Sequence, residues 1–336
     1  MLAHSNPAVQ LDSLRTSTHT NALRADRRVK VLCATRALSR SDATVRRAHA
    51  IARDLGAQLL LLHVIDFGTP MRAVRRRGAL AYTVLDASAR DLGLNSEHIS
   101  VRSGQPHQTI ADVAMEWDAD LIVIGPYRQR FAEGVRGTSA ERIARRAGRP
   151  VLVVNLESTE PYQNVLLTSD LSRMSAGIAG VTKDLGLLER SKRSVVHALE
   201  HTRNAMLYMA GVKRTTVRQY HRSMRQLAES EIHVQLFSVG LDPAQFKIFA
   251  PQVPPTRAIE QVARRTGSEL IVVGSSRFPD LKRVFIGSVS NEILRSGRHD
   301  VLLVSPAAAH RARRRASAVA TQRVASERSH QTAPLH

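Results

Sequence analysis

The segment Ala-Asp-Leu-Ile-Val-Ile-Gly at residues 119–125 returns as Ser-Glu-Leu-Ile-Val-Val-Gly at residues 268–274. Each is followed by a second matching segment, Pro-Val-Leu-Val-Val at residues 150–154 and Asp-Val-Leu-Leu-Val at residues 300–304. The repeat is about 140 residues long, which is the size of a domain and far longer than a solenoid unit. The sequence therefore predicts two tandem copies of one small domain.

The two copies differ in length. Residues 31–41 are echoed by residues 165–175, an offset of 134, whereas Gly125 and Gly274 are 149 apart. The second copy therefore has about fifteen extra residues between these points. We place them at residues 241–255, a proline-rich stretch interpreted as a tolerated loop, a lid or a contact for a partner.

Apolar runs of strand length alternate with segments of helical periodicity in both copies. Strands are expected at residues 29–34, 59–64, 99–102, 121–124 and 151–154, and again at 165–168, 195–199, 232–237, 270–273 and 301–304. Alternation of this kind predicts an α/β fold, here two tandem open parallel five-stranded α/β sandwich domains of Rossmann-like type. The expected division is a disordered segment 1–28, domains at 29–156 and 162–305, and a basic disordered tail 306–336.

Composition excludes several classes of protein. The 336 residues hold one cysteine, Cys33, so no disulfide can form within the chain and a reducing compartment is expected. No stretch reaches the roughly 20 apolar residues that span a bilayer, and the N-terminus lacks the pattern of a signal peptide. We therefore expect a cytoplasmic protein that has no membrane partner.

Charge is the other unusual property, because the formal net charge is +20 at pH 7. A field of this sign attracts polyanions without regard to their sequence. The arginines that could make such contacts fall into three groups: Arg142, Arg145, Arg146 and Arg149; Arg75, Arg76 and Arg77; Arg311, Arg313, Arg314 and Arg315. No aromatic residues are interleaved with them to stack on bases. The alternative interpretation is that these side chains only solvate the surface.

In an open parallel sheet, ligands bind beyond the carboxyl ends of the strands. In the second copy, Asp170 ends the first strand and offers a carboxylate to a ribose hydroxyl or a base amine. The fourth strand is followed by Gly-Ser-Ser-Arg at 274–277, and Gly-Ser-Val-Ser at 287–290 opens a helix. Backbone amides, hydroxyls and a helix N-terminus together outline a cradle for phosphate. The alternative is that the two glycines are turn residues and that Ser288 is only a helix cap.

These segments resemble the universal stress protein family, which belongs to a superfamily that includes adenine-nucleotide hydrolases. The resemblance rests on the strand ending at Asp170, on Leu-His-Val at 62–64, on Gly-Ser-Val-Ser-x-x-Ile-Leu-Arg at 287–295 and on the closing run at 150–154. It covers about residues 29–305. It implies that the last strands of the two copies pair antiparallel, so that the chain forms a pseudo-dimer by itself.

Both copies depart from the loop of the ATP-binding members, which has glycine, two residues, glycine, nine residues, glycine and then serine or threonine. The second copy has Arg277 in place of the middle glycine, and its guanidinium could pair with phosphate instead. The first copy has Arg128 there, a loop shorter by one residue, and Arg36 in place of the aspartate. We interpret the first copy as degenerate. The resemblance assigns nucleotide contacts in the second copy to Asp170, Ala198, Gly274, Ser275, Arg277, Gly287, Ser288 and Ser290.

Three functions remain open from the sequence. One is a stress-response or regulatory protein that binds an adenine nucleotide, with ATP as the candidate ligand and at most slow ATP hydrolysis. Another is a scaffold that binds a protein partner or a second copy of itself and has no ligand. The third is a non-specific binder of nucleic acid through the arginine groups. No catalytic residue and no metal site are expected, because the sequence has no P-loop ending in Gly-Lys-Ser/Thr, no Gly-x-Gly-x-x-Gly after a strand, no His-Glu-x-x-His and no pair of cysteines.

Overall fold

The computed structural model describes residues 28–37, 39, 42–126, 138–158, 160–199, 212–275 and 288–331. Their strands form a single ten-stranded sheet in the order β3-β2-β1-β4-β5-β10-β9-β6-β7-β8. The strands are β1 Lys30–Ala34, β2 Gln58–Asp66, β3 Ile99–Gly104, β4 Leu121–Ile124, β5 Val151–Val153, β6 Asn164–Thr168, β7 Lys192–Val196, β8 Phe246–Phe249, β9 Leu270–Gly274 and β10 Asp300–Val304. Neighbouring strands pair in parallel, except that β5 and β10 pair antiparallel, with Leu152 opposite Leu302.

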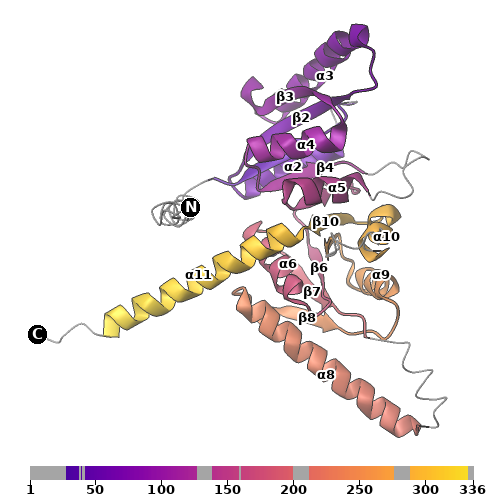
Figure 1. The fold of residues 1–336 in the computed structure, drawn as a ribbon, viewed down its shortest axis with the longest axis vertical. Coiled ribbons are helices and arrows are strands. Elements are labelled where there is room, and N and C mark those ends of the chain that lie inside the picture. Colours follow the sequence, from indigo (N-terminus) through magenta and orange to yellow (C-terminus); the bar gives the residue numbers. More distant parts are fainter. Residues whose placement is uncertain are drawn as a thin grey trace, which may run out of the picture.

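This order confirms the predicted fold class and the predicted antiparallel seam between the two copies (Figure 1). Each copy contributes five strands, and the second half of the order repeats the first half about the β5–β10 pair. The near-continuous apolar runs of the strands follow from this arrangement, because both faces of the sheet are covered by helices.

Helices cover the two faces of the sheet in two sets. They are α2 Ala43–Asp54, α3 Met71–Asp91, α4 Pro106–Glu116, α5 Ser139–Ala147, α6 Arg173–Asp184, α8 Arg214–Ser238, α9 Pro255–Thr266, α10 Ser288–Ser296 and α11 Pro306–Gln331, with short 3-10 turns at Ser96–His98 and Pro243–Gln245. One core cluster joins the sheet to α2, α3, α6, α8 and α11, and the other joins it to α4, α5, α9 and α10. Successive residues of β1 alternate between the two clusters, as the pleat requires: Val31 and Cys33 face one, and Leu32 and Ala34 face the other.

The third strand of the second copy lies elsewhere than the sequence predicts. Residues 232–237, expected to be a strand, form the end of helix α8, and the strand β8 lies at Phe246–Phe249. The apolar residues Ala228, Ile232 and Leu236 recur at four-residue spacing and are buried, so a helix satisfies them as well as a strand would. The interpretation of 241–255 as an insertion is therefore wrong, because this stretch carries β8.

The additional length of the second copy lies before α8 instead. The connection from β7 to α8 runs from residue 197 to 213, whereas the connection from β2 to α3 runs only from 67 to 70. Helix α8 is also longer than α3, with 25 residues against 21. Part of this connection, residues 200–211, lies outside the described residues.

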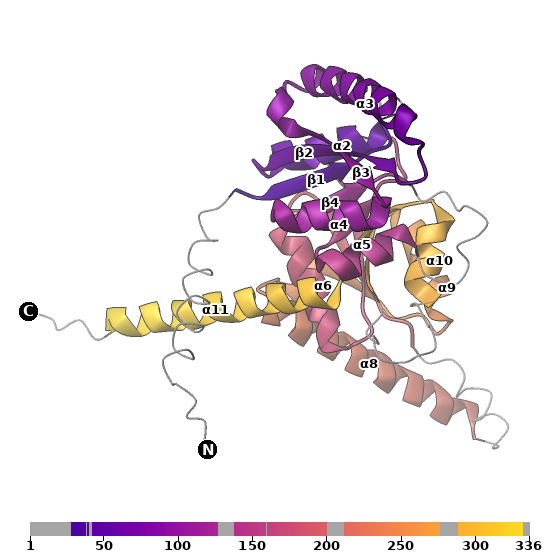
Figure 2. The same ribbon diagram turned by 45° about the horizontal axis from the view of Figure 1, so that its top comes forward.

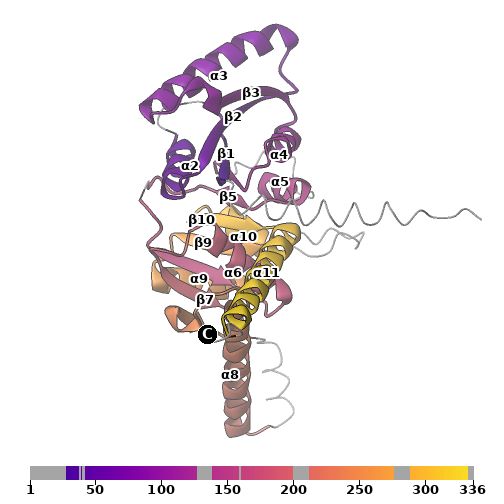
Figure 3. The ribbon, with the colours of Figure 1, turned by 90° about the vertical axis from the view of Figure 1, so that its left-hand side faces the viewer.

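The C-terminal segment is also different from the expected disordered tail, because α11 is helical from Pro306 to Gln331 (Figure 2). Its first turns pack on α6, where Ala308, Ala309 and Ala312 are buried. A Cβ placed on Gly177 of α6 would lie 2.6 Å from the Ala309 Cβ, so only glycine permits this approach. A stripe of alanine against glycine lacks the large apolar residues by which amphipathic helices are usually found in a sequence. Figure 3 shows α11 alongside α6.

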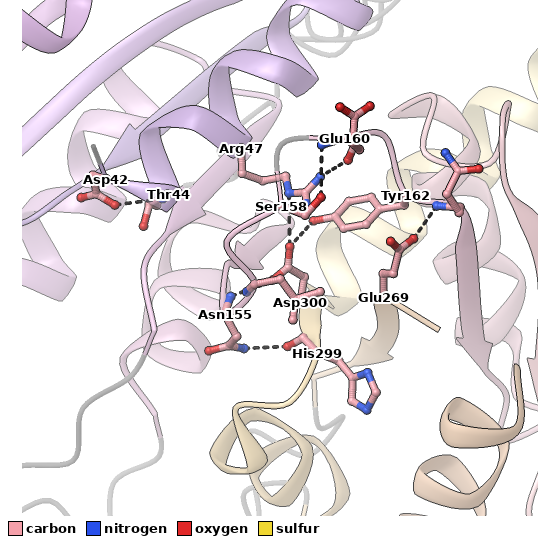
Figure 4. A network of polar contacts seen from close by, with 12 residues as sticks. Asp42, Thr44, Arg47, Asn155, Ser158, Glu160, Tyr162, Glu269, His299 and Asp300 are labelled. Atoms are coloured by element: carbon pink, nitrogen blue, oxygen red, sulfur yellow. Dashed lines mark hydrogen bonds and ion pairs between the residues drawn. The ribbon is translucent and has the colours of Figure 1, made fainter. Parts of the chain in front are cut away.

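A buried polar network ties the two copies together across the segment that links them (Figure 4). Asp300 Oδ1, at the start of β10, accepts hydrogen bonds from the backbone N–H groups of Asn155 at 2.7 Å and Leu156 at 2.8 Å. Asp300 Oδ2 accepts from the Tyr162 hydroxyl at 2.6 Å and lies 3.4 Å from Arg47 Nε of α2, which is ion-pair distance without hydrogen-bond geometry. The Arg47 guanidinium also stacks on the Tyr162 ring, 4.3 Å from its centroid. Burial, and next the nearby charge of Asp300, raise the pKa of the Tyr162 hydroxyl well above its ordinary value.

Candidate functional site

A cavity of about 460 Å³ opens at the carboxyl ends of β6 and β9, between α6, α9 and α10. This volume lies in the range of cavities that hold small molecules and cofactors. One part of its wall is apolar, formed by Met174, Ile178, Val196, Pro255, Ile259, Val273 and Val289. The other part is polar, formed by Thr168, Ser169, Asp170, Ser175, His197, Ser275 and Ser290. An amphipathic ligand with a flat apolar portion and a polar portion fits such a lining.

Asp170 is fixed at the mouth of the cavity by the turn that joins β6 to α6. Its Oδ1 accepts hydrogen bonds from the Ser172 N–H at 2.9 Å and from the Ser175 hydroxyl at 2.8 Å. Leu171 adopts φ of 59°, which brings the backbone back over the carboxylate. Ala37, the equivalent residue of the first copy, also has a positive φ of 49°. The turn after the first strand is therefore a shared feature of the fold, and it carries a carboxylate at this position in the second copy only.

The histidine of the Leu-His-Val segment has a structural role in both copies. His197 Nδ1 lies 2.9 Å from the Ser169 carbonyl oxygen, and His63 Nδ1 lies 3.1 Å from the Thr35 carbonyl oxygen. Each ring thereby ties the second strand of its copy to the turn after the first strand. In the second copy this contact holds the turn that carries Asp170.

Gly274 permits close packing of the sheet on α6. A Cβ at this position would lie 2.9 Å from Met174 Cε and 3.1 Å from Ile178 Cδ1. Ser275 follows it, with its N–H donating to the Val304 carbonyl at 2.9 Å, so the strand end beside the cavity is held by β10. The structural reason for Gly274 is thus packing, and it coexists with the position of the residue in the cavity wall.

Ser290 is linked to the first copy through Glu141 of α5. The Ser290 hydroxyl donates to Glu141 Oε1 at 3.0 Å, although 149 residues separate the two in sequence. Glu141 Oε2 accepts from the Thr138 N–H at 3.1 Å, and the Glu141 N–H donates to Thr138 Oγ1 at 3.2 Å, which completes a capping box. Burial raises the pKa of the Glu141 carboxyl, against the hydrogen bonds from Thr138 and Ser290 that lower it.

The structure brings together five of the predicted site residues. The cavity wall contains Asp170, Ala198, Gly274, Ser275 and Ser290. Ser288 begins α10, and Arg277 and Gly287 lie outside the described residues. The apolar wall and Glu141 were missed. Met174 and Ile178 stand four residues apart on α6, and this spacing places them on one face of the helix, but nothing in the sequence separates a cavity wall from a core.

Three polar groups of the cavity have no counterpart at the equivalent positions of the first copy. Arg36 stands where the second copy has Asp170, Pro126 where it has Ser275, and Ala140 where it has Ser290. Proline offers no N–H and alanine offers no hydroxyl. Asp42 caps α2 at the Thr44 N–H, as Ser172 caps α6 at the Met174 N–H, and also accepts from the Thr35 hydroxyl.

The N-terminus of α5 is already occupied by a carboxylate of its own. Glu141 accepts the Thr138 N–H, so an anion at this helix end would meet a negative group. The equivalent residue at the start of α10 is Asn291, which is neutral. The two copies thus share a fold but differ in the residue at this position, and the Glu141 carboxyl lies beside both helix ends because Ser290 of α10 donates to it.

Comparison with known proteins agrees with the duplication. A model of the universal stress protein family matches residues 28–155 and matches again at residues 161–305. The chain belongs to the universal stress protein family. Universal stress proteins of Mycobacterium tuberculosis strain H37Rv and of Mycobacterium bovis are each 27% identical to it over 230 residues, which cover 64% of this chain and 70% of theirs.

Solved structures show the same fold at lower identity. A universal stress protein from Archaeoglobus fulgidus is 16% identical, covers 82% of this chain with 98% of its own, and superposes with a TM-score of 0.54. A putative universal stress protein from Pseudomonas aeruginosa is 18% identical, covers 86% of this chain with 97% of its own, and has a TM-score of 0.53. In the part of this universal stress protein that the structure describes, no helix is both long and apolar enough to cross a bilayer.

Proposed function

We propose that this tandem universal stress protein is a stress-response regulator that binds one adenine nucleotide, with ATP as the candidate ligand, in its second copy. The observation that carries the proposal is the cavity beside Asp170, which combines an apolar wall with polar groups from both the sheet end and the helices around it. The apolar wall suits a base, Asp170 suits a ribose hydroxyl or an amine, and the Ser275 hydroxyl suits a phosphate oxygen, whereas the Ser290 hydroxyl donates its proton to Glu141.

The first copy serves as support for the second in this proposal. Its loss of the carboxylate and both serines removes the groups that would hold a nucleotide. Its contribution is Glu141, which positions Ser290 across the boundary between the copies. We place the protein in the cytoplasm, in keeping with its single buried cysteine.

Binding of radiolabelled ATP, measured by equilibrium dialysis, tests the proposal. Asp170→Asn keeps an oxygen that can accept the Ser172 and Ser175 hydrogen bonds but removes the charge, so the turn should persist while ATP affinity falls. Arg36→Gln changes the equivalent position of the first copy and is the matched control, which should leave ATP affinity unchanged. Absence of saturable binding by the wild type, or equal effects of the two variants, would contradict the proposal.

A further inference from the structure

The N-terminal half of helix α8 carries a line of exposed arginines. Arg214, Arg218, Arg222 and Arg225 follow one another at intervals of four, four and three residues, so they lie on one side of the helix. All four are exposed, and together they extend over about 16 Å at 1.5 Å per residue. This arginine ridge lies on the part of α8 that points away from the sheet (Figure 1).

The charge of the arginine ridge is not neutralised within the described part of the chain. Glu229 is the first acidic residue of the helix. The ion pairs found between described residues use other arginines: Arg47, Arg53, Arg90, Arg146, Arg149, Arg298 and Arg315. Ion pairs already engage Arg146 of α5 with Asp112, and Arg149, just after α5, with Asp118. Both arginines belong to the group 142–149 that the sequence suggested as a polyanion contact.

Helix stability does not account for the ridge. The N-terminus of a helix carries a partial positive charge, which favours acidic residues in the first turn and disfavours basic ones. The first turn of α8 contains no acidic residue, and Lys213 with Arg214 stands at its start. The positive charge at the start of α8 therefore opposes the helix dipole. The arginine side chains are exposed, so packing against the body does not compensate for this cost.

The position of the apolar residues of α8 favours nucleic acid over a membrane. Tyr220, Leu227 and Val234 are exposed and recur every seven residues. At 100° per residue this stripe falls on the side of the helix opposite the ridge. A bilayer that accepted the stripe would leave the arginines facing away from it. The ridge lies on the side of α8 that packs on the body farther along the helix, at Ile232 and Leu236, and it is exposed to a phosphate backbone because the N-terminal half of α8 extends beyond the body (Figure 1).

We propose that the arginine ridge of α8 binds the phosphate backbone of duplex nucleic acid without reading its sequence. This surface is distinct from the cavity beside Asp170 and does not depend on nucleotide binding there. The contacts would be guanidinium to phosphate, and the ridge offers no aromatic partner for stacking on bases.

Fluorescence anisotropy of a labelled 20-base-pair duplex tests the proposal on the full chain. For four phosphate contacts, the wild-type affinity should fall about 150-fold between 50 and 200 mM salt, since the logarithmic slope is about −0.9 per contact. The triple variant Arg218→Gln, Arg222→Gln, Arg225→Gln should reduce that slope by about 2.7. Glutamine is a good helix former, so α8 should persist, and circular dichroism of the variant should match the wild type.

The matched control is Arg75→Gln, Arg76→Gln, Arg77→Gln, which removes the same charge from α3 at the opposite end of the molecule (Figure 1). This control should lower the logarithmic salt slope by less than about 0.9, the value of one phosphate contact. Equal losses in the two triple variants would show an effect of net charge alone and overturn the proposal. Flotation with vesicles of anionic lipid, without any duplex binding, would also overturn it in favour of a membrane surface. Asp170→Asn should leave duplex binding intact, which separates this test from that of the nucleotide site.

Discussion

Removal of the charge on Asp300 should strongly destabilise the protein, because that charge sits at the junction of both copies. The carboxylate is fully buried and accepts hydrogen bonds from the Asn155 and Leu156 N–H groups and the Tyr162 hydroxyl. Asp300→Asn keeps an oxygen for the two backbone donors, and its new amide can donate to the Tyr162 hydroxyl. The variant cannot neutralise the positive charge of the Arg47 guanidinium, whose side chain is only 2% exposed.

The magnitude follows from that uncompensated charge. Breaking a buried ion pair by removal of one partner typically costs about 3–5 kcal/mol. We therefore expect Asp300→Asn to lose about 3 kcal/mol or more in the free energy of unfolding, a large part of the roughly 5–15 kcal/mol that stabilises a typical protein. Arg47→Met should cost a similar amount, whereas the double variant should cost clearly less than the sum, because neither partner is left buried and unpaired.

Urea unfolding followed by circular dichroism measures all four members of this cycle. An exposed pair provides the control: Arg146 and Asp112 lie 2.7 Å apart but are 49% and 39% exposed, so Arg146→Met should leave the unfolding midpoint near that of the wild type. The reasoning is refuted if each single change at Arg47 and Asp300 costs under about 1 kcal/mol, or if their effects simply add.

Three further outcomes are expected. Gly177→Ala should lower the melting temperature, because its Cβ would lie 2.6 Å from that of Ala309, whereas Gly78→Ala in α3, with its nearest neighbour at 3.4 Å, should not; equal melting temperatures would contradict the α6–α11 packing. Burial raises the folded-state pKa of Glu141, which gives a contribution to stability that is present below the ordinary Glu pKa of 4.5 and lost as pH rises through the folded value, so Glu141→Gln should gain stability relative to the wild type as pH rises above the ordinary value; a constant difference would contradict this. Burial raises the pKa of the Cys33 thiol, so alkylation by iodoacetamide should be slow in the folded protein and rapid in urea, and rapid labelling of the native chain would disprove the burial.

The fold was predictable because its determinants are local and repeated. The runs at 151–154 and 301–304 and the glycines at 125 and 274 define the strands in each copy, and the alternation of strands and helices leaves few possible topologies. Residues 232–237 were misread because Ile-His-Val-Gln-Leu-Phe alternates apolar and polar residues as a strand does, while Ile232 and Leu236 also fit the helical spacing set by Ala228. Helix α11 was missed because its packing face consists of alanines, whose burial depends on glycines of α6 that are far away in sequence.

The candidate site was predictable at its polar end and not beyond it. Asp170, Ser275 and Ser290 follow strand ends or begin a helix, and these places are where a parallel sheet presents its ligand groups. The contact between Ser290 and Glu141 spans two copies, and only the packing of α5 beside α10 reveals it. The asymmetry of the copies was visible in Arg36, while its structural counterpart, the capping box of Thr138 and Glu141 that fills the N-terminus of α5, has the readable Thr-x-x-Glu signature and was missed.

The central claim is that duplication of a universal stress protein domain has left one nucleotide site and one supporting copy. Titration calorimetry with ATP measures the number of sites per chain directly. The account predicts a stoichiometry of one, lost in Asp170→Asn and kept in Arg36→Gln. Two sites per chain would contradict the assignment of the first copy as support, and no measurable binding would contradict the assignment of the second as the site.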